Sequence, residues 1–201
     1  MMMIIMHLFK NQKNGLNKMI KLNDLIMEVQ LSKYQLFATG TGGRGGGNWK
    51  FDGMKLPTGK LKIYNRMSCG NKPAGAFWTS SYKQKFKGSD WTRWKKQNMS
   101  HWDTGEAFVF KVVGSPKIAR VKNYKDYDKL FKKYGAGHYA ANCSEGDRYL
   151  DWHALAKDYD VFHLASYRGL GPVGIHPNDW SSESVVWFNM NKLEFVGTTA
   201  V

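Results

Sequence analysis

The chain has 201 residues, of which 42% are hydrophobic and 14% aromatic, and this is enough material for one sizeable core. Eight Trp and ten Tyr residues exclude an intrinsically disordered chain. The net charge of +14 arises from residues 1–133, because residues 134–201 hold more acidic than basic residues. A basic surface of this size fits a nucleic acid, a phosphate-bearing cofactor, or simple solubility.

The first residues contain an apolar run followed by an amphipathic pattern. Residues 1–9, MMMIIMHLF, are too short to span a bilayer and lack the positive flank of a signal peptide. We therefore treat residues 1–18 as a leader or a mis-assigned start. Helical periodicity then predicts a helix over residues 19–31 that acts as a packing arm, with one apolar face formed by Met19, Leu22, Ile26 and Val29.

A glycine-rich stretch, GTGGRGGG, occupies residues 40–47. It lacks the spacing of the known phosphate-binding loops, so a flexible linker is the favoured interpretation, with nucleic-acid contact through Arg44 second. We expect residues 19–50 to form the helix and linker, and residues 51–201 to form the main domain.

Short apolar runs separated by turn residues predict an α+β fold with split antiparallel β-sheets and flanking helices. Helices are expected after Ser89, after Asn123 and after Asp151, because each of these residues can cap a helix N-terminus. The run after the turn at residues 114–116 is expected to pair with the run before it. The predicted strands lie near residues 61–66, 76–80, 107–113, 118–122, 161–165, 184–189 and 193–196.

The helix after Ser89 combines aromatic and basic residues. Trp91 and Trp94 share one face, which suits either stacking on nucleic-acid bases or packing in a core. We expect the surrounding basic residues to be exposed together and to contact a nucleic acid or another acceptor; these are Lys83, Lys85, Lys87, Arg93, Lys95 and Lys96.

Several chemistries have no support in the sequence. Cys69 and Cys143 belong to no CxxC pair, so we expect reduced thiols in a cytoplasmic protein and no metal site. The six histidines are scattered without metal-ligand spacing and are interpreted as satisfied or exposed structural residues. No G-x-S-x-G motif exists, which leaves serine hydrolase chemistry without support.

Three polar features follow one another along the predicted strands. The first strand ends in Arg66, the second in Thr79-Ser80-Ser81, and a late strand opens with Glu183 in WSSESVVWFN. A carboxylate at the mouth of a buried strand is held rigidly and partly desolvated, which suits stabilisation of developing positive charge. The alternative is that Glu183 caps a loop or lies in solvent.

This order resembles the ADP-ribosyltransferase fold of the arginine–serine–glutamate type, and residues 158–197 also look like the C-terminal half of ADP-ribosyltransferase-like domains of phages. The resemblance implies that Arg66 contacts the NAD phosphates, that Thr79, Ser80 and Ser81 support the nicotinamide side, and that Glu183 stabilises the nicotinamide ribose. Tyr64 could instead mark the histidine–tyrosine–glutamate branch. Ser181 stands where the family often has Glu or Gln, so transfer to arginine is not expected.

The resemblance therefore implies a phage-encoded, NAD-dependent mono-ADP-ribosyltransferase that acts in the cytoplasm on a host protein or a nucleic acid. NAD is its substrate, and neither a metal nor a membrane is implied. We expect Arg66, Thr79, Ser80 and Glu183 to converge on one cleft. The alternatives are a non-enzymatic, basic nucleic-acid-binding protein and a virion-associated protein.

Overall fold

The computed structural model describes residues 31–37, 57–65, 72–99, 106–136, 149–166, 180 and 182–201. Residues Ser32–Val201 belong to one structural unit. The glycine-rich stretch 40–47 and nearly all of the predicted helix 19–31 lie outside the described residues, as do Arg66, Cys69 and Cys143.

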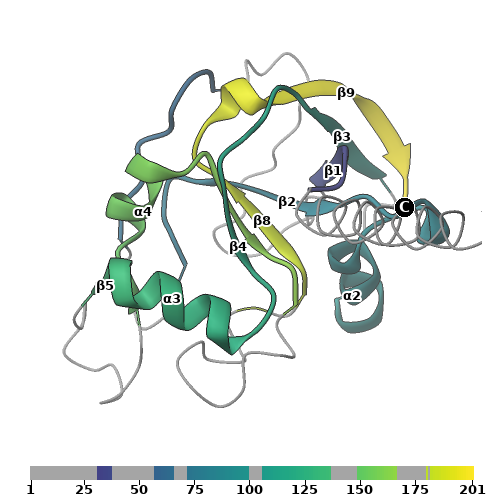
Figure 1. Cartoon of the computed structure of the whole chain (residues 1–201). Coiled ribbons are helices and arrows are strands. Elements are labelled where there is room, and N and C mark those ends of the chain that lie inside the picture. Colours follow the sequence, from purple (N-terminus) through teal and green to yellow (C-terminus); the bar gives the residue numbers. More distant parts are fainter. Residues whose placement is uncertain are drawn as a thin grey trace, which may run out of the picture. The chain divides into compact units, whose positions relative to one another are not determined.

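Seven strands form one sheet in the order β4-β7-β8-β2-β1-β3-β9 (Figure 1). Only β4 and β7 are parallel, and every other neighbouring pair in this sheet is antiparallel. The α+β class with a mostly antiparallel sheet is therefore confirmed. The strands are β1 Tyr34–Phe37, β2 Phe77–Ser81, β3 Glu106–Val112, β4 Ile118–Val121, β7 Val161–Leu164, β8 Ser184–Trp187 and β9 Leu193–Ala200, and a separate pair is formed by β5 Gly135–Ala136 and β6 Tyr149–Leu150.

Each of the three predicted capping residues begins a helix. The side chains of Ser89, Asn123 and Asp151 accept hydrogen bonds from backbone N–H groups of the first helical turn, which otherwise have no partner. The helices are α2 Asp90–Asn98, α3 Tyr124–Tyr134 and α4 Trp152–Asp158, with short 3-10 turns η1 Gln84–Phe86 and η3 Met190–Lys192.

Strand β2 joins two halves of the sheet. Its residues Phe77–Thr79 pair with β8, whereas Ser80 and Ser81 pair with β1. The strands that we expected in two small sheets are therefore linked into one sheet, and a single strand changes its partner between Thr79 and Ser80.

Three features of this sheet differ from those predicted from the sequence. Strand β1 was missed, and because it pairs with both β2 and β3, a domain beginning at residue 51 is wrong. Residues 61–65 form no strand; within the described part of this region only Lys60 and Tyr64 make isolated bridges. Strand β4 pairs with β7 and not with β3, because α3 and α4 lie in the connection that brings the chain back parallel to β4.

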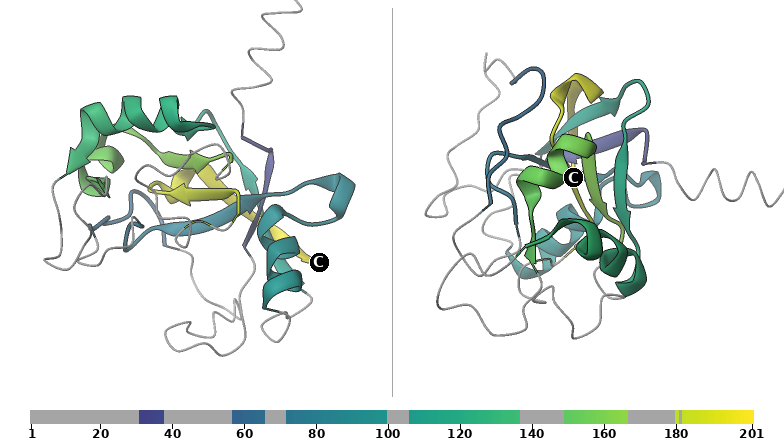
Figure 2. Two further views of the ribbon diagram at one scale, coloured as in Figure 1. Left: turned by 90° about the horizontal axis from the view of Figure 1, so that it is seen from below. Right: turned by 60° about the vertical axis from the view of Figure 1, so that its left-hand side comes forward.

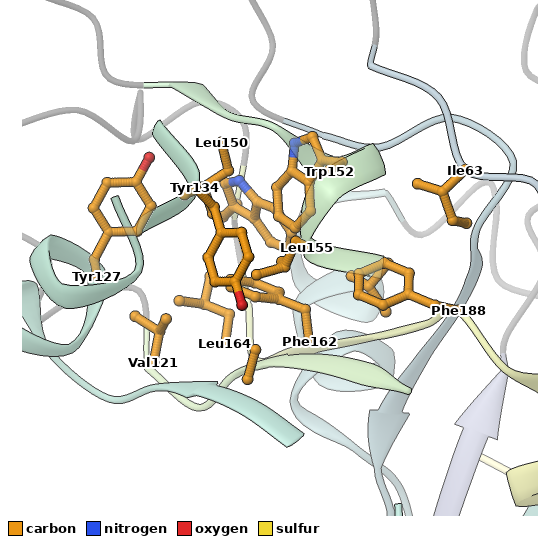
Figure 3. Close-up of a cluster of buried hydrophobic side chains, with 13 residues drawn as sticks. Ile63, Val121, Tyr127, Tyr134, Leu150, Trp152, Leu155, Phe162, Leu164 and Phe188 are labelled. Atoms are coloured by element: carbon orange, nitrogen blue, oxygen red, sulfur yellow. The ribbon is translucent and has the colours of Figure 1, made fainter. Parts of the chain in front are cut away.

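The main core lies on one face of the β4-β7-β8 half. Helices α3 and α4 cover this face (Figures 1 and 2), and Figure 3 shows the buried side chains between helices and strands. Strand residues Ala119, Phe162 and Val186 are register partners and belong to this core. Side chains alternate along a strand, so the adjacent row Arg120, His163 and Val185 points to the opposite face.

Candidate functional site

The candidate site lies where β2 changes its partner. Glu183 comes directly before β8, and Ser80 and Ser81 form the last two residues of β2. Because β2 and β8 are antiparallel, the end of β2 meets the beginning of β8. This pairing brings together residues that are about one hundred positions apart in the sequence.

The Glu183 carboxylate receives four hydrogen bonds. Its Oε2 atom accepts from Ser80 Oγ at 2.7 Å and from the Ser81 backbone N–H at 2.8 Å. Its Oε1 atom accepts from Ser81 Oγ at 2.7 Å and lies 2.9 Å from Nε2 of His163. A carboxylate has about four acceptor sites, so the protein itself occupies all of them.

These contacts keep the buried Glu183 ionised. Its side chain is only 5% exposed, and burial alone would raise the pKa of the carboxyl group. The hydrogen bond from His163, together with the hydroxyls of Ser80 and Ser81, outweighs burial and holds the pKa of Glu183 below its ordinary value. The interpretation of Glu183 as a solvent-exposed residue is therefore wrong.

A second chain of hydrogen bonds runs from β8 through β2 and β1 to the carboxylate. Trp187 Nε1 donates to Thr79 Oγ1 at 2.7 Å, and the Thr79 hydroxyl donates to Gln35 Oε1 at 3.1 Å. The Gln35 amide then donates to Ser81 Oγ at 3.4 Å, whose hydroxyl donates to Glu183. All donors point towards the carboxylate, and hydrogen bonds aligned in this way strengthen one another.

His163 is a residue that the sequence analysis did not place in the site. It lies within β7, whose four residues are all buried, and is itself 4% exposed. Because the ionised Glu183 only accepts, Nε2 of His163 must carry the hydrogen. A lone polar residue inside the apolar run VFHLA was the available signal, since such a residue needs a buried partner. Gln35 was missed together with β1.

The other predicted cofactor-binding residues have different places. Thr79 reaches Glu183 only through Gln35 and Ser81. Tyr64 is 48% exposed and lies under the Lys62 ammonium group, 5.2 Å from the centre of its ring, outside the hydrogen-bond network around Glu183. Arg66 lies outside the described residues, so its predicted convergence with Glu183 stays a prediction.

The predicted basic face on and before α2 is only partly formed. Lys95 is 1% exposed, so the expectation that it is exposed is wrong. Its position three residues after the buried Thr92 puts it on the inner face of the helix. Lys83 and Arg93 both pair with Asp90, which offsets part of their charge. Lys85, Lys87, Arg93 and Lys96 are exposed, and Lys83 is half-buried.

The two tryptophans of α2 lie on its more open side. Trp91 and Trp94 stack on each other with ring centres 5.1 Å apart and an angle of 16° between the rings, and both are half-buried. The helix thus buries Lys95 and Thr92 and leaves the indole rings partly accessible, which reverses the arrangement expected for a Trp core with solvated lysines.

Comparisons with known protein families, curated proteins and solved structures found no match to this chain. Within the described ranges, no group of three or more His, Cys, Asp or Glu side chains is arranged to hold a metal ion. None of the helices in the described part of the chain is long and apolar enough to cross a lipid bilayer.

Proposed function

We propose that this protein cleaves NAD and transfers its ADP-ribose group to a host protein or a nucleic acid. The observation that supports the proposal is the buried, ionised carboxylate of Glu183, which Ser80, Ser81 and His163 hold in a fixed position. In the reaction the bond between ribose and nicotinamide breaks, and its electron pair leaves with nicotinamide. The resulting positive charge on the ribose is stabilised by the carboxylate.

A substrate hydroxyl needs a free acceptor site on Glu183. Ser80 can provide one, because its Oγ atom also lies 3.2 Å from the backbone carbonyl oxygen of Glu183. If the Ser80 hydroxyl donates to this carbonyl alone, Oε2 becomes free to accept from a ribose hydroxyl. The Ser81 and His163 contacts then still hold the carboxylate in place.

The same proposal gives roles to Arg66, to the acceptor nucleophile and to Thr79. Arg66 binds the NAD phosphates, because a guanidinium group can hold a diphosphate through two parallel hydrogen bonds. The acceptor nucleophile attacks the ribose carbon and loses its proton, which completes the transfer. Thr79 supports the site indirectly by orienting Gln35 against Ser81.

The decisive experiment measures NAD consumption and label transfer for Glu183→Gln. The substitution keeps the size of the side chain and removes its charge, so turnover should fall roughly 10²–10³-fold while NAD affinity holds. Labelled NAD is incubated with cell lysate, and label is read separately on protein and RNA. Glu194→Gln is the matched control, because Glu194 is an exposed carboxylate on β9 that pairs with Lys111. Equal turnover of both variants would refute the proposal.

A second candidate function rests on α2. The stacked and partly accessible Trp91 and Trp94, with Lys96 exposed on the same helix, suit non-enzymatic binding of single-stranded nucleic acid. Trp91→Ala and Trp94→Ala should each weaken binding of an unstructured oligonucleotide by about 1–3 kcal/mol. Affinity that depends on salt, is lost in both variants and occurs without NAD turnover would favour this function.

A further inference from the structure

Among the residues that the structure describes, three buried polar atoms beside the candidate site have no hydrogen-bond partner. They are Nε and Nη1 of Arg120 and Nδ1 of His163, and none of them forms a hydrogen bond. A buried donor of a charged group that lacks a partner destabilises the folded protein, so few such atoms occur in native proteins. Their presence together in one place requires an explanation.

Arg120 and His163 are direct neighbours in the sheet. They are register partners on the parallel strands β4 and β7, so their side chains leave the sheet on the same face. This face is opposite to the core under α3 and α4, and it is also the face on which His163 contacts Glu183. The unpartnered atoms therefore adjoin the carboxylate of the candidate site.

The chemistry of the two side chains is complementary to a particular kind of ligand. The Arg120 guanidinium only donates hydrogen bonds and always carries a positive charge. His163 gives its Nε2 hydrogen to Glu183, so in the neutral ring Nδ1 carries a lone pair and accepts. A ligand that satisfies both must offer an oxyanion to Arg120 and a hydroxyl group to His163.

We propose that Arg120 and His163 form a binding site for a ribose phosphate, in which the phosphate accepts hydrogen bonds from Arg120 and a ribose hydroxyl donates to Nδ1 of His163. The inference rests on the proposed function only in taking this ribose phosphate to be part of NAD. Arg120 then contacts a phosphate oxygen, and Glu183 and His163 contact ribose hydroxyls.

Arg120 should lower the stability of the free protein. In the free protein the two unpartnered guanidinium nitrogens of Arg120 are a cost, so Arg120→Met, which keeps an unbranched side chain as far as the position of Nε and removes the charge, should raise Tm. A purely structural Arg120 would show the opposite result. The matched control is Lys129→Met, which removes the same charge from an exposed position on α3 and should leave Tm nearly unchanged.

Binding is measured by calorimetric titration of the full chain with ribose 5-phosphate, inorganic phosphate and ribose. Ribose 5-phosphate should bind more tightly than phosphate or ribose alone. Arg120→Met should weaken the binding of ribose 5-phosphate at least tenfold, because it removes charge-assisted hydrogen bonds, whereas Lys129→Met should bind as the wild type does.

A second variant tests the role of Nδ1. His163→Gln keeps an amide nitrogen near the position of Nε2, so the contact with Glu183 can form, but nothing replaces Nδ1. This variant should bind ribose 5-phosphate and inorganic phosphate about equally, because only the hydroxyl contact is lost. A preference for ribose 5-phosphate as strong as in the wild type would refute the assignment of Nδ1.

The site is refuted if the wild type does not bind ribose 5-phosphate at millimolar concentration, if Arg120→Met binds it as the wild type does, or if Arg120→Met lowers Tm or fails to fold. These results are separable from those on NAD turnover. Binding of ribose 5-phosphate through Arg120 without NAD turnover would refute the transferase and leave the site. NAD turnover with the same KM in Arg120→Met would refute the site and leave the transferase.

Discussion

The two faces of the β4-β7-β8 half of the sheet differ in the charged and titratable residues that they bury on the same three strands. On the helix-covered face, Ala119, Phe162 and Val186 lie side by side in an apolar core. On the other face the adjacent row contains Arg120 and His163, which are charged or titratable and bear unpartnered buried atoms. Burial of the apolar row stabilises the fold, whereas burial of Arg120 and His163 costs free energy unless their polar atoms are satisfied.

This difference separates what holds the fold from what serves the candidate site. Residues at which local rules of burial are broken are expected at functional sites, and other parts of the protein compensate for them. Here Glu183 is satisfied by four donors, and the neighbouring Arg120 is not. Substitutions on the two faces should therefore differ in size, and for Arg120→Met also in sign.

The largest effect is expected for Phe162→Ala on the apolar face. Phe162 is fully buried and packs edge-to-face against Trp152, with ring centres 5.0 Å apart. Removing the ring should lower the free energy of unfolding by about 3–5 kcal/mol, measured by urea unfolding. Val196→Ala on β9 is the control, because Val196 is 47% exposed and should change stability by only about 0.5 kcal/mol. Similar losses in the two variants would contradict the difference between core and surface.

At the candidate site beside this face, Ser81→Ala should have the next largest effect. The variant removes a hydroxyl that donates to the ionised Glu183 and also accepts from Gln35. Hydrogen bonds to charged groups contribute about 1.5–3 kcal/mol, and urea unfolding should show a loss of this size.

Ser184→Ala is the control for Ser81→Ala, because the Ser184 hydroxyl donates only to the neutral carbonyl oxygen of Ser182. Its loss should be about 0.5–1.5 kcal/mol. A loss for Ser81→Ala that is no larger than this would mean that the Glu183 contacts contribute little to stability.

A smaller effect is expected at the cap of α4, on the helix-covered side. Asp151 accepts a hydrogen bond from the Ala154 backbone N–H and another from Asn65 Nδ2. The second of these hydrogen bonds ties Asn65 to the beginning of the helix. Asp151→Ala should cost about 1 kcal/mol in the free energy of unfolding. Asp151→Asn keeps an acceptor oxygen and should retain most of the stability, so an equal loss in both variants would argue against capping as the cause.

The smallest effect is expected in the response of Tm to acid. This response best distinguishes the two faces of the sheet. The folded-state pKa of Glu183 is lowered, so its contribution to stability is fully present above the unfolded value of about 4.3. It is lost as the pH falls through the lower folded-state pKa, because the folded protein must then protonate Glu183. Phe162→Ala should keep this loss of Tm in acid, whereas Glu183→Gln should reduce it. An equal acid response in Glu183→Gln and the wild type would place the titration elsewhere.

The sequence by itself determined the local elements of the protein. Asn123, followed by apolar residues at helical spacing, specified the beginning of α3, and Asp151 specified α4 in the same way. These signals lie within about ten residues of one another, so they act before any distant contact forms. The resemblance also singled out Ser80, Ser81 and Glu183, which the structure brings into direct contact.

The tertiary structure decided the partners of these elements. Four residues, YQLF, are too few to show a pattern, and their place as β1 depends on β2 and β3, which lie far along the chain. The same holds for β4, which pairs with β7 only because α3 and α4 fill the crossover. His163 acquires its role only beside Glu183, since a polar side chain in an apolar strand is stable only with the partner that folding brings to it.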